Sequence, residues 1–225
     1  MRLFKYLLKL ILIGFFGVTI LWVLLLRFIN PPVTLLMIER GFERKAAGKN
    51  WKIDKDWVSF DDMSINIKKA AVASEDQLFL EHHGFDLRAI ERAIDKNQHS
   101  NKLIGGSTIS QQTAKNVFLW PGRSYIRKAF EAYFTMLIEA LWSKERIMEV
   151  YLNVIEMGDG IYGIEAASET YFKRHASELN KQQSALIVGV WPNPLKWSPV
   201  KPTQYIRHRS YLIMKNMRRL GPLDF

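Results

Sequence analysis

The segment Gly105–Asn116, which reads GGSTISQQTAKN, organises our interpretation of the chain. Two glycines lead into hydroxyl residues, which is typical of a turn that opens a helix. The backbone N–H groups of such a turn can bind an anion. Ser107, Gln111 and Lys115 recur at every fourth residue, so we expect them on one helix face. A plain capped helix would read alike, but polar residues so dense after the glycines favour a ligand-binding face.

Upstream, two adjacent acids, Glu75 and Asp76, begin the motif EDQLFLEHHG, which ends at Gly84. Apolar residues flank the pair on both sides, and such surroundings make a carboxylate a stronger general base. Alternatively, the two acids are solvated at the start of a helix, where they favour its dipole. His82 and His83 could ligate a metal, but adjacent side chains on a helix point apart, so we expect structural roles for them.

Downstream, a third cluster contains Arg123, Arg127 and Lys128, followed by Glu131. On a helix, Arg127 or Lys128 or both would share the face of Glu131. A surface ion pair of this kind contributes only about 0.2–0.5 kcal/mol, so the cluster alone indicates no function.

Two more motifs follow, KERIMEVYLN at residues 144–153 and GDGIYG at residues 158–163. The second matches the G-x-G-x-x-G fingerprint of dinucleotide-binding proteins. It follows a helical pattern rather than a strand, and no βαβ unit surrounds it, so we reject a dinucleotide site.

The 225-residue chain has a net charge of +10 and no cysteine, which excludes disulfides and thiolate metal sites. Between Leu195 and Leu223 it has seven Lys or Arg residues and no acid. This basic C-terminal zone favours anionic partners: nucleic acid, acidic lipid or a phosphorylated substrate. Charge alone does not choose among them.

The run Leu10–Leu26 contains 17 uncharged residues. As a helix it would span about 25 Å, close to the ~30 Å hydrocarbon core of a bilayer. It is longer than the apolar region of a signal peptide and has no small-x-small cleavage site after it. Its apolar residues also cover every face, unlike those of a half-exposed soluble helix. The three preceding cations, Arg2, Lys5 and Lys9, indicate a cytoplasmic N-terminus.

We therefore divide the chain into a transmembrane anchor (1–30), a polar linker (31–53) with Gly41 and Gly48 among its breakers, and one domain (54–225). The domain is predicted to be mainly α, because strand signals are few and short. Four segments with helical periodicity follow residues that favour the N-cap position: Asp86, Ser124, Ser143 and Thr203.

Taken in order, the motifs resemble those of the family 51 peptidoglycan glycosyltransferases. The matching patterns are EDxxFxxHxG from Glu75, GGSTISQQ with a following KN from Gly105, RKxxE from Arg127 and KxxIxExYLN from Lys144. The first or third alone would be weak, whereas four in order at the family's spacing are specific. The resemblance covers roughly residues 54–220. With one such domain and no transpeptidase domain, the chain resembles the monofunctional members.

The resemblance implies a mainly helical, lysozyme-like domain with two lobes flanking a cleft. It implies that lipid II is polymerised into β-1,4 glycan strands of the cell wall, with inversion and release of polyprenyl diphosphate. Glu75 matches the general base that deprotonates the attacking sugar 4-hydroxyl. The leaving diphosphate needs positive charge rather than a proton donor. The basic residues of the second and third motifs can supply that charge, and Glu131 would orient them or help to hold a divalent metal, Mg²⁺ or Mn²⁺.

The predicted site has two catalytic residues, Glu75 and Glu131, and seven substrate-binding residues: Ser107, Gln111, Lys115, Arg123, Arg127, Lys128 and Asn153. The expected partners are lipid II, the growing lipid-linked glycan and the membrane. Binding of other cell-wall synthesis or division proteins is left open. We expect no organic cofactor and no nucleic acid.

Two other functions would share part of this sequence pattern. A lytic, lysozyme-like muramidase would share the fold, but its sugar leaving group needs a carboxylic acid and no diphosphate-binding cations. A membrane-tethered protein that binds nucleic acid or acidic lipid through the basic C-terminal zone would leave Glu75 and the GGSTISQQ motif without a purpose.

The anchor and its flanking charges predict a domain on the outer side of the inner membrane. A reporter that is active only outside the cytoplasm should be active when fused after Phe225 and inactive when fused before Met1. The opposite pattern would separate the domain from an extracytoplasmic substrate and contradict the assignment.

Overall fold

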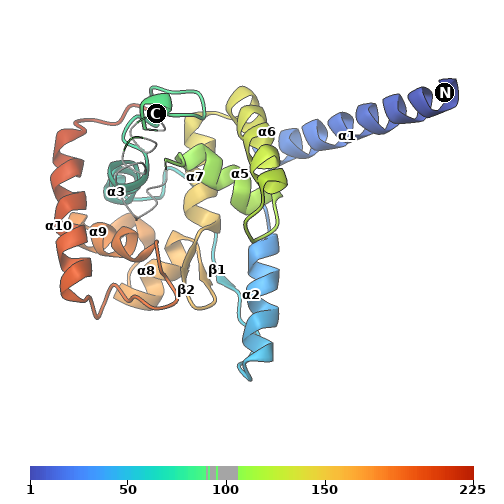
Figure 1. Ribbon diagram of the computed structural model, residues 1–225. Coiled ribbons are helices and arrows are strands. Elements are labelled where there is room, and N and C mark those ends of the chain that lie inside the picture. The colour runs from blue at the N-terminus through green and yellow to red at the C-terminus, as the bar shows by residue number, and fades with distance from the viewer. Residues whose placement is uncertain (90, 92–94, 96–105) are drawn as a thin grey trace.

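The computed structural model describes residues 1–89, 91, 95 and 106–225 (Figure 1). These residues are mainly helical, which confirms the predicted fold class. The helices are α1 (Arg2–Phe28), α2 (Leu35–Ala46), α3 (Ile65–Glu75), α5 (Ile109–Phe118), α6 (Tyr125–Leu141), α7 (Lys144–Val154), α8 (Ile164–Phe172), the 3-10 helix η1 (Ala176–Glu178), α9 (Lys181–Val190) and α10 (Gln204–Arg219). Gly105 and four residues of the helix expected after Asp86 (90 and 92–94) lie outside the described residues.

The predicted N-caps that can be compared with the structure are confirmed. The side chains of Ser124, Ser143 and Thr203 each accept a hydrogen bond from the backbone N–H three residues later. Asp86 does the same for the N–H of Ala89, at 2.8 Å. These interactions are local, which is why the sequence alone was sufficient to find them.

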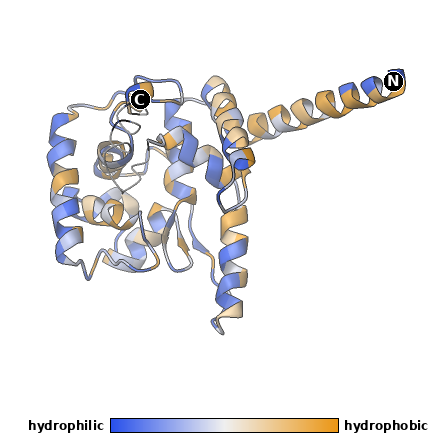
Figure 2. Ribbon diagram, in the orientation of Figure 1, coloured by the Kyte–Doolittle hydropathy of each residue, from blue (hydrophilic) through white to orange (hydrophobic). Residues whose placement is uncertain are grey.

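Helix α1 is long and apolar enough to cross a membrane and projects from the helical body (Figures 1 and 2). Only three of its residues are buried, and all lie in its C-terminal half: Thr19, Val23 and Leu26. The remainder of the helix presents apolar side chains on every side, as a lipid-exposed segment does.

The C-terminal half of α1 is docked on α6 by polar as well as apolar contacts. The hydroxyls of Thr19 and Tyr133 lie 2.7 Å apart. The indole N–H of Trp142, at the end of α6, donates to the carbonyl of Val23 at 2.9 Å. Because both contacts are hydrogen bonds between helices, they fix the position of α1 relative to the helical domain.

Arg146 of α7 adds a cap to the end of the same helix. Its Nη2 donates to the carbonyls of Leu26 and Ile29 at 2.9 and 3.0 Å. The last carbonyls of a helix lack intrahelical partners, and the negative end of its dipole favours a cation. Arg146 therefore fixes the point at which α1 ends.

The segment expected to be a polar linker instead contains α2, in which Gly41 is buried. The expectation that Gly41 breaks a helix is therefore wrong. A Cβ on Gly41 would lie 2.5 Å from the ring of Trp51, so glycine lets the indole pack directly against the helix. Arg40 and Arg44 bind Glu156 and Asp159 of the β-hairpin, which attaches α2 to the body.

Helix α5 is the central element of the core. Eight of its ten residues are buried, and it packs against α2, α6 and α7. Phe118 at its end stacks on Phe134 of α6 with the ring centroids 4.5 Å apart. The GGSTISQQ motif thus opens the helix on which the other helices are assembled.

A small sheet has the strand order β1 (Asp54–Lys55), β3 (Ile161–Tyr162) and β2 (Glu156–Gly158). β1 runs parallel to β3, and β2 runs antiparallel to it. The GDGIYG motif therefore forms a hairpin with Asp159 and Gly160 at its turn, a pair that suits such turns. Its last glycine, Gly163, precedes α8 at φ +81° and ψ 160°, a region that is essentially restricted to glycine.

The backbone conformation of Gly163 and its close packing predict that a larger residue there destabilises the fold. A Cβ there would lie 2.8 Å from the Asn153 carbonyl oxygen. Gly163→Ala should lower the free energy of unfolding by roughly 2–4 kcal/mol, because backbone strain and a backbone clash add. Gly48→Ala is the matched control, with φ +72° and nothing within 4 Å of its Cβ, and should cost roughly 1 kcal/mol. Urea unfolding in detergent compares the two, and equal losses would contradict the role of the close approach.

Candidate active site

Two cavities lie on either side of a hydrogen bond between Gln112 and Glu75. The first, the cationic cavity, has a volume of about 430 Å³. The polar residues that line it are Arg40, Gln112, Lys115, Asn116, Arg123, Arg127 and Glu156. The second cavity, of about 470 Å³, is lined by Glu75 together with Asp76, Asp86, Arg88, Ser107 and Thr108. Gln112 Nε2 donates to Glu75 Oε2 at 3.1 Å, so this bond joins the two cavities.

Glu75 is the last residue of α3, and its carboxylate is surrounded by donors. Oε1 accepts a hydrogen bond from Ser74 Oγ at 2.9 Å, and Oε2 accepts the one from Gln112. Arg209 Nη2 lies 3.5 Å from Oε1. The apolar surroundings expected from the sequence are therefore wrong at the carboxylate. Flanking apolar residues point into the core, whereas Glu75 points toward polar groups of α5 and α10.

Tyr151 of α7 sets the direction of Gln112. The wholly buried Tyr151 hydroxyl donates to Gln112 Oε1 at 3.2 Å, which leaves the amide nitrogen to face Glu75. Burial raises the pKa of Tyr151 well above its ordinary value, and the charges of Glu75 and Asp76 add to the effect. The hydroxyl thus remains a donor. Neither Gln112 nor Tyr151 was among the predicted site residues.

Asp76, next to Glu75, has a structural function. One carboxylate oxygen accepts the backbone N–H of Ile109 at 3.0 Å, and the other accepts His82 Nε2 at 2.9 Å. His82 Nδ1 accepts the N–H of Gly84, which agrees with the structural role expected for this histidine. The buried Asp76 thereby connects the end of α3 to the first turn of α5.

Ser107, Gln111 and Lys115 do not form one ligand-binding surface, which corrects the expectation from their spacing. The helix begins at Ile109, and Thr108 and Gln111 form a capping box in which Gln111 Oε1 accepts the N–H of Thr108 at 3.0 Å. Gln111 is buried there and lines neither cavity. Ser107 precedes the helix and lines the second cavity, whereas Lys115 lines the cationic one. The T-x-x-Q pattern is a capping-box signature that could have identified this role.

Asn153 is also placed away from both cavities. Its amide exchanges two hydrogen bonds with the backbone of Val58, at 3.0 and 2.9 Å, and donates to the carbonyl of Glu149 at 2.8 Å. The side chain is wholly buried, so its polar atoms are occupied by the backbone. This geometry gives Asn153 a structural function in place of the expected contact with substrate.

The predicted cations do come together. Lys115 and the exposed Arg123 line the cationic cavity, and neither side chain forms a hydrogen bond or ion pair within the described part of the chain. Arg127 is buried at its wall. Buried Glu131 accepts from Arg127 Nη1 at 2.9 Å and from Lys128 Nζ at 2.5 Å. Glu131 therefore orients two cations, as one of its two predicted roles required.

The surroundings of Lys115 disfavour its charged form. Burial lowers the pKa of its ammonium group, and the opposing attraction of Glu131 is smaller. Arg127 and Lys128 lower this pKa further. An anion that entered the cavity would stabilise the charged form of Lys115.

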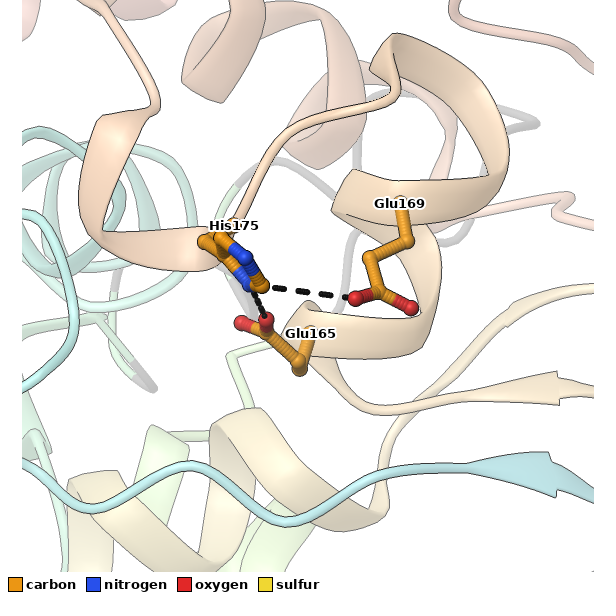
Figure 3. A group of neighbouring side chains, drawn as sticks. All are labelled: Glu165, Glu169 and His175. Atoms are coloured by element: carbon orange, nitrogen blue, oxygen red, sulfur yellow. Dashed lines mark hydrogen bonds and ion pairs between the residues drawn. The ribbon is translucent and has the colours of Figure 1, made fainter.

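The donors around the cationic cavity do not fit the divalent metal that was considered. Glu131 is bound by two cations, and Glu156 is bound by Arg40 at 3.1 Å. Within the described ranges, one group has metal-ligating geometry, Glu165, Glu169 and His175 (Figure 3). It lines neither cavity, and Glu165 is already bound to His175 Nδ1 and to the N–H of Ala176, both at 2.7 Å.

Comparison with known proteins agrees with this arrangement. Residues 44–218 match the family model described as Transglycosylase. The matched segment begins within α2 and ends within α10. The chain belongs to the transglycosylase family. The domain of that family is lysozyme-like, as the resemblance implied.

Relatives of this transglycosylase cover nearly its whole length. A protein of Pseudomonas savastanoi pv. phaseolicola is 48% identical over 210 residues, which are 93% of this chain and 89% of the relative. One of Pseudomonas aeruginosa is 45% identical over 224 residues, 100% and 94% of the two chains. One of Caulobacter vibrioides is 49% identical over 205 residues, 90% and 87% of the two chains. All three bear the name biosynthetic peptidoglycan transglycosylase.

The lowered pKa of Lys115 predicts how the transglycosylase responds to alkaline pH. If the ammonium binds an anionic substrate, kcat/KM should fall as the pH rises through this lowered pKa, because kcat/KM reports groups of the free enzyme. Lys115→Arg keeps its charge at higher pH, so it should move the alkaline limb upward while lowering the maximal rate. Lys215→Arg in the basic C-terminal zone is the control. The same alkaline limb in wild type and Lys115→Arg would exclude Lys115 as the titrating group.

Proposed function

We propose that this transglycosylase polymerises lipid II into β-1,4 glycan strands for the bacterial cell wall, with release of polyprenyl diphosphate. The observation that carries the proposal is that Glu75 lines the second, polar cavity and is hydrogen-bonded to Gln112, which lines the cationic cavity. The names of the relatives support the same reaction class.

In this proposal, the cationic cavity binds the diphosphate of the growing chain. Lys115, Arg123 and Arg127 supply positive charge, and the charge of Glu156 is offset by Arg40. When the bond from the anomeric carbon to the diphosphate breaks, the electron pair leaves with the diphosphate, and fixed cations stabilise it. Exposed Trp120, next to this site, offers an apolar surface along which the polyprenyl chain could leave.

The second cavity would hold the acceptor lipid II with its 4-hydroxyl at Glu75. The carboxylate takes the hydroxyl proton while the oxygen attacks the anomeric carbon on the face opposite the diphosphate, which inverts the configuration. Ser107 and Arg88 line this cavity and provide polar contacts for the acceptor.

The muramidase alternative is less well supported by the same geometry. Hydrolysis of a glycosidic bond requires a protonated carboxyl group at the departing sugar oxygen. The carboxylates of Asp76 and Glu131 are bound to backbone, histidine or cationic donors. The cations of the first cavity would have no function in hydrolysis.

We further propose that α1 anchors the enzyme in the inner membrane with a cytoplasmic N-terminus and a periplasmic domain. Its length and apolar character support membrane insertion, and the flanking cations support the orientation. Docking of α1 on α6 would hold both cavities close to the lipid-borne substrates.

Glu75→Gln tests the proposal. The amide keeps the size of the side chain but cannot accept the proton, so polymerisation of purified lipid II should fall roughly 10²–10⁴-fold, with little change in substrate binding. Gel analysis of the polymer measures the rate, and chromatography should detect no soluble muropeptides. Retention of more than half of the wild-type turnover would exclude Glu75 as the base, and muropeptide release would favour the muramidase.

A further inference from the structure

Arg209 of α10 reaches the predicted base from outside both cavities. Its Nη2 lies 3.1 Å from Ser74 Oγ and 3.5 Å from Glu75 Oε1. Arg209 is not among the residues that line either cavity, so it contacts Glu75 without forming part of the substrate-sized spaces. In the sequence, Arg209 belongs to the basic C-terminal zone, and nothing in the sequence indicates that it contacts Glu75.

The placement of Arg209 is specific rather than a property of that basic zone. Its Nε is buried and has no hydrogen-bond partner among the residues that the structure describes. Burying a guanidinium donor is unfavourable unless a fixed anionic or polar neighbour compensates. Arg207, two residues earlier on α10, is exposed, and its side chain donates to the carbonyl of Pro202 at 2.7 Å.

Ser74 transmits the effect of Arg209 to the carboxylate. A serine hydroxyl has one proton to donate, and its oxygen can accept. Because Arg209 donates to Ser74 Oγ, the hydroxyl proton is directed to Glu75 Oε1, at 2.9 Å. Gln112 holds Oε2 from α5, so the carboxylate is fixed at both oxygens.

We infer that Arg209 is a positioning residue for Glu75: through Ser74 and its own charge, it holds the carboxylate in the one orientation from which it can take the acceptor proton. The inference rests on the proposed function of Glu75 as general base. The contact of 3.5 Å is longer than a hydrogen bond, so Arg209 adds attraction while leaving lone pairs of Oε1 available. A reacting group that is misplaced by about 1 Å can lose about 10²-fold in rate.

Arg209→Ala should therefore lower kcat for lipid II polymerisation by about 10–100-fold and change KM by less than about threefold. Arg209→Lys should keep part of the rate, because the charge remains but the planar fork is lost. The side chain is 27% exposed, so added guanidinium chloride, well below denaturing concentrations, should partly restore kcat in Arg209→Ala. Ser74→Ala should lose less than Arg209→Ala, and the two losses should not add in the double variant.

Two controls separate positioning from structure. Arg207→Ala removes an exposed cation from the same helix and should leave kcat unchanged. Asn216→Ala removes a hydrogen bond between α10 and the Ala73 carbonyl at the end of α3, at 3.3 Å, without touching Glu75. It should reduce the melting temperature more than it reduces kcat, and it should not respond to guanidinium.

The possible outcomes are distinguishable. A folded Arg209→Ala variant with a rate within twofold of wild type would overturn the inference while leaving the proposed function intact, provided that Glu75→Gln is inactive. A loss that appears in KM, or that guanidinium does not reverse and Asn216→Ala reproduces, would also overturn it. Wild-type protein that forms no polymer, or an active Glu75→Gln variant, would instead contradict the proposed function itself.

Discussion

The site depends on the carboxylate of Asp76. It is buried, and it connects two helices whose ends would otherwise be independent: it follows the last residue of α3 and accepts the first N–H of α5. An anion at a helix N-terminus is favoured by the helix dipole and by the unpaired N–H groups there. His82 occupies the remaining side of the carboxylate. Because Asp76 joins the end of α3 to the start of α5, the neighbouring Glu75 lies beside Gln112 of α5.

Around that junction, polar side chains from four helices converge on one carboxylate. Ser74 and Glu75 come from α3, Gln112 from α5, Tyr151 from α7 and Arg209 from α10. Tyr151 orients Gln112, and Arg209 orients Ser74, so that Gln112 and Ser74 each donate to one oxygen of Glu75. Groups held by helices rather than by loops require little rearrangement when a reaction begins. Near the cationic cavity, Glu131 likewise orients Arg127 and Lys128 by accepting a hydrogen bond from each.

Features set by neighbouring residues could be predicted from the sequence, whereas features set by packing could not. The caps at Ser124, Ser143 and Thr203 depend on the next three residues and were correct. The spacing of Gln111 and Lys115 suggested a ligand-binding face, whereas the side chain of Gln111 caps the helix with Thr108 and the adjacent Gln112 contacts Glu75. From the sequence, Gly41 was expected to break a helix. The structure shows that glycine is needed within α2 because the ring of Trp51 packs against it. No local pattern distinguishes Arg209 from Arg207, since their difference arises from the packing of α10 on α3.

The docking of α1 has a consequence for how the molecule can move. A flexible linker would let the domain rotate independently of α1. The contacts at Thr19, Val23 and Leu26 instead make α1 and the domain move as one rigid unit. Any change in the inclination of α1 must then be passed on to α6 and α7 and to the walls of the cavities. Bilayer thickness, which governs the tilt of a spanning helix, would in this way set the angle at which the enzyme meets its lipid-bound reactants. In the proposed membrane-bound arrangement, another apolar helix of the same length would lack these contacts with α6 and α7.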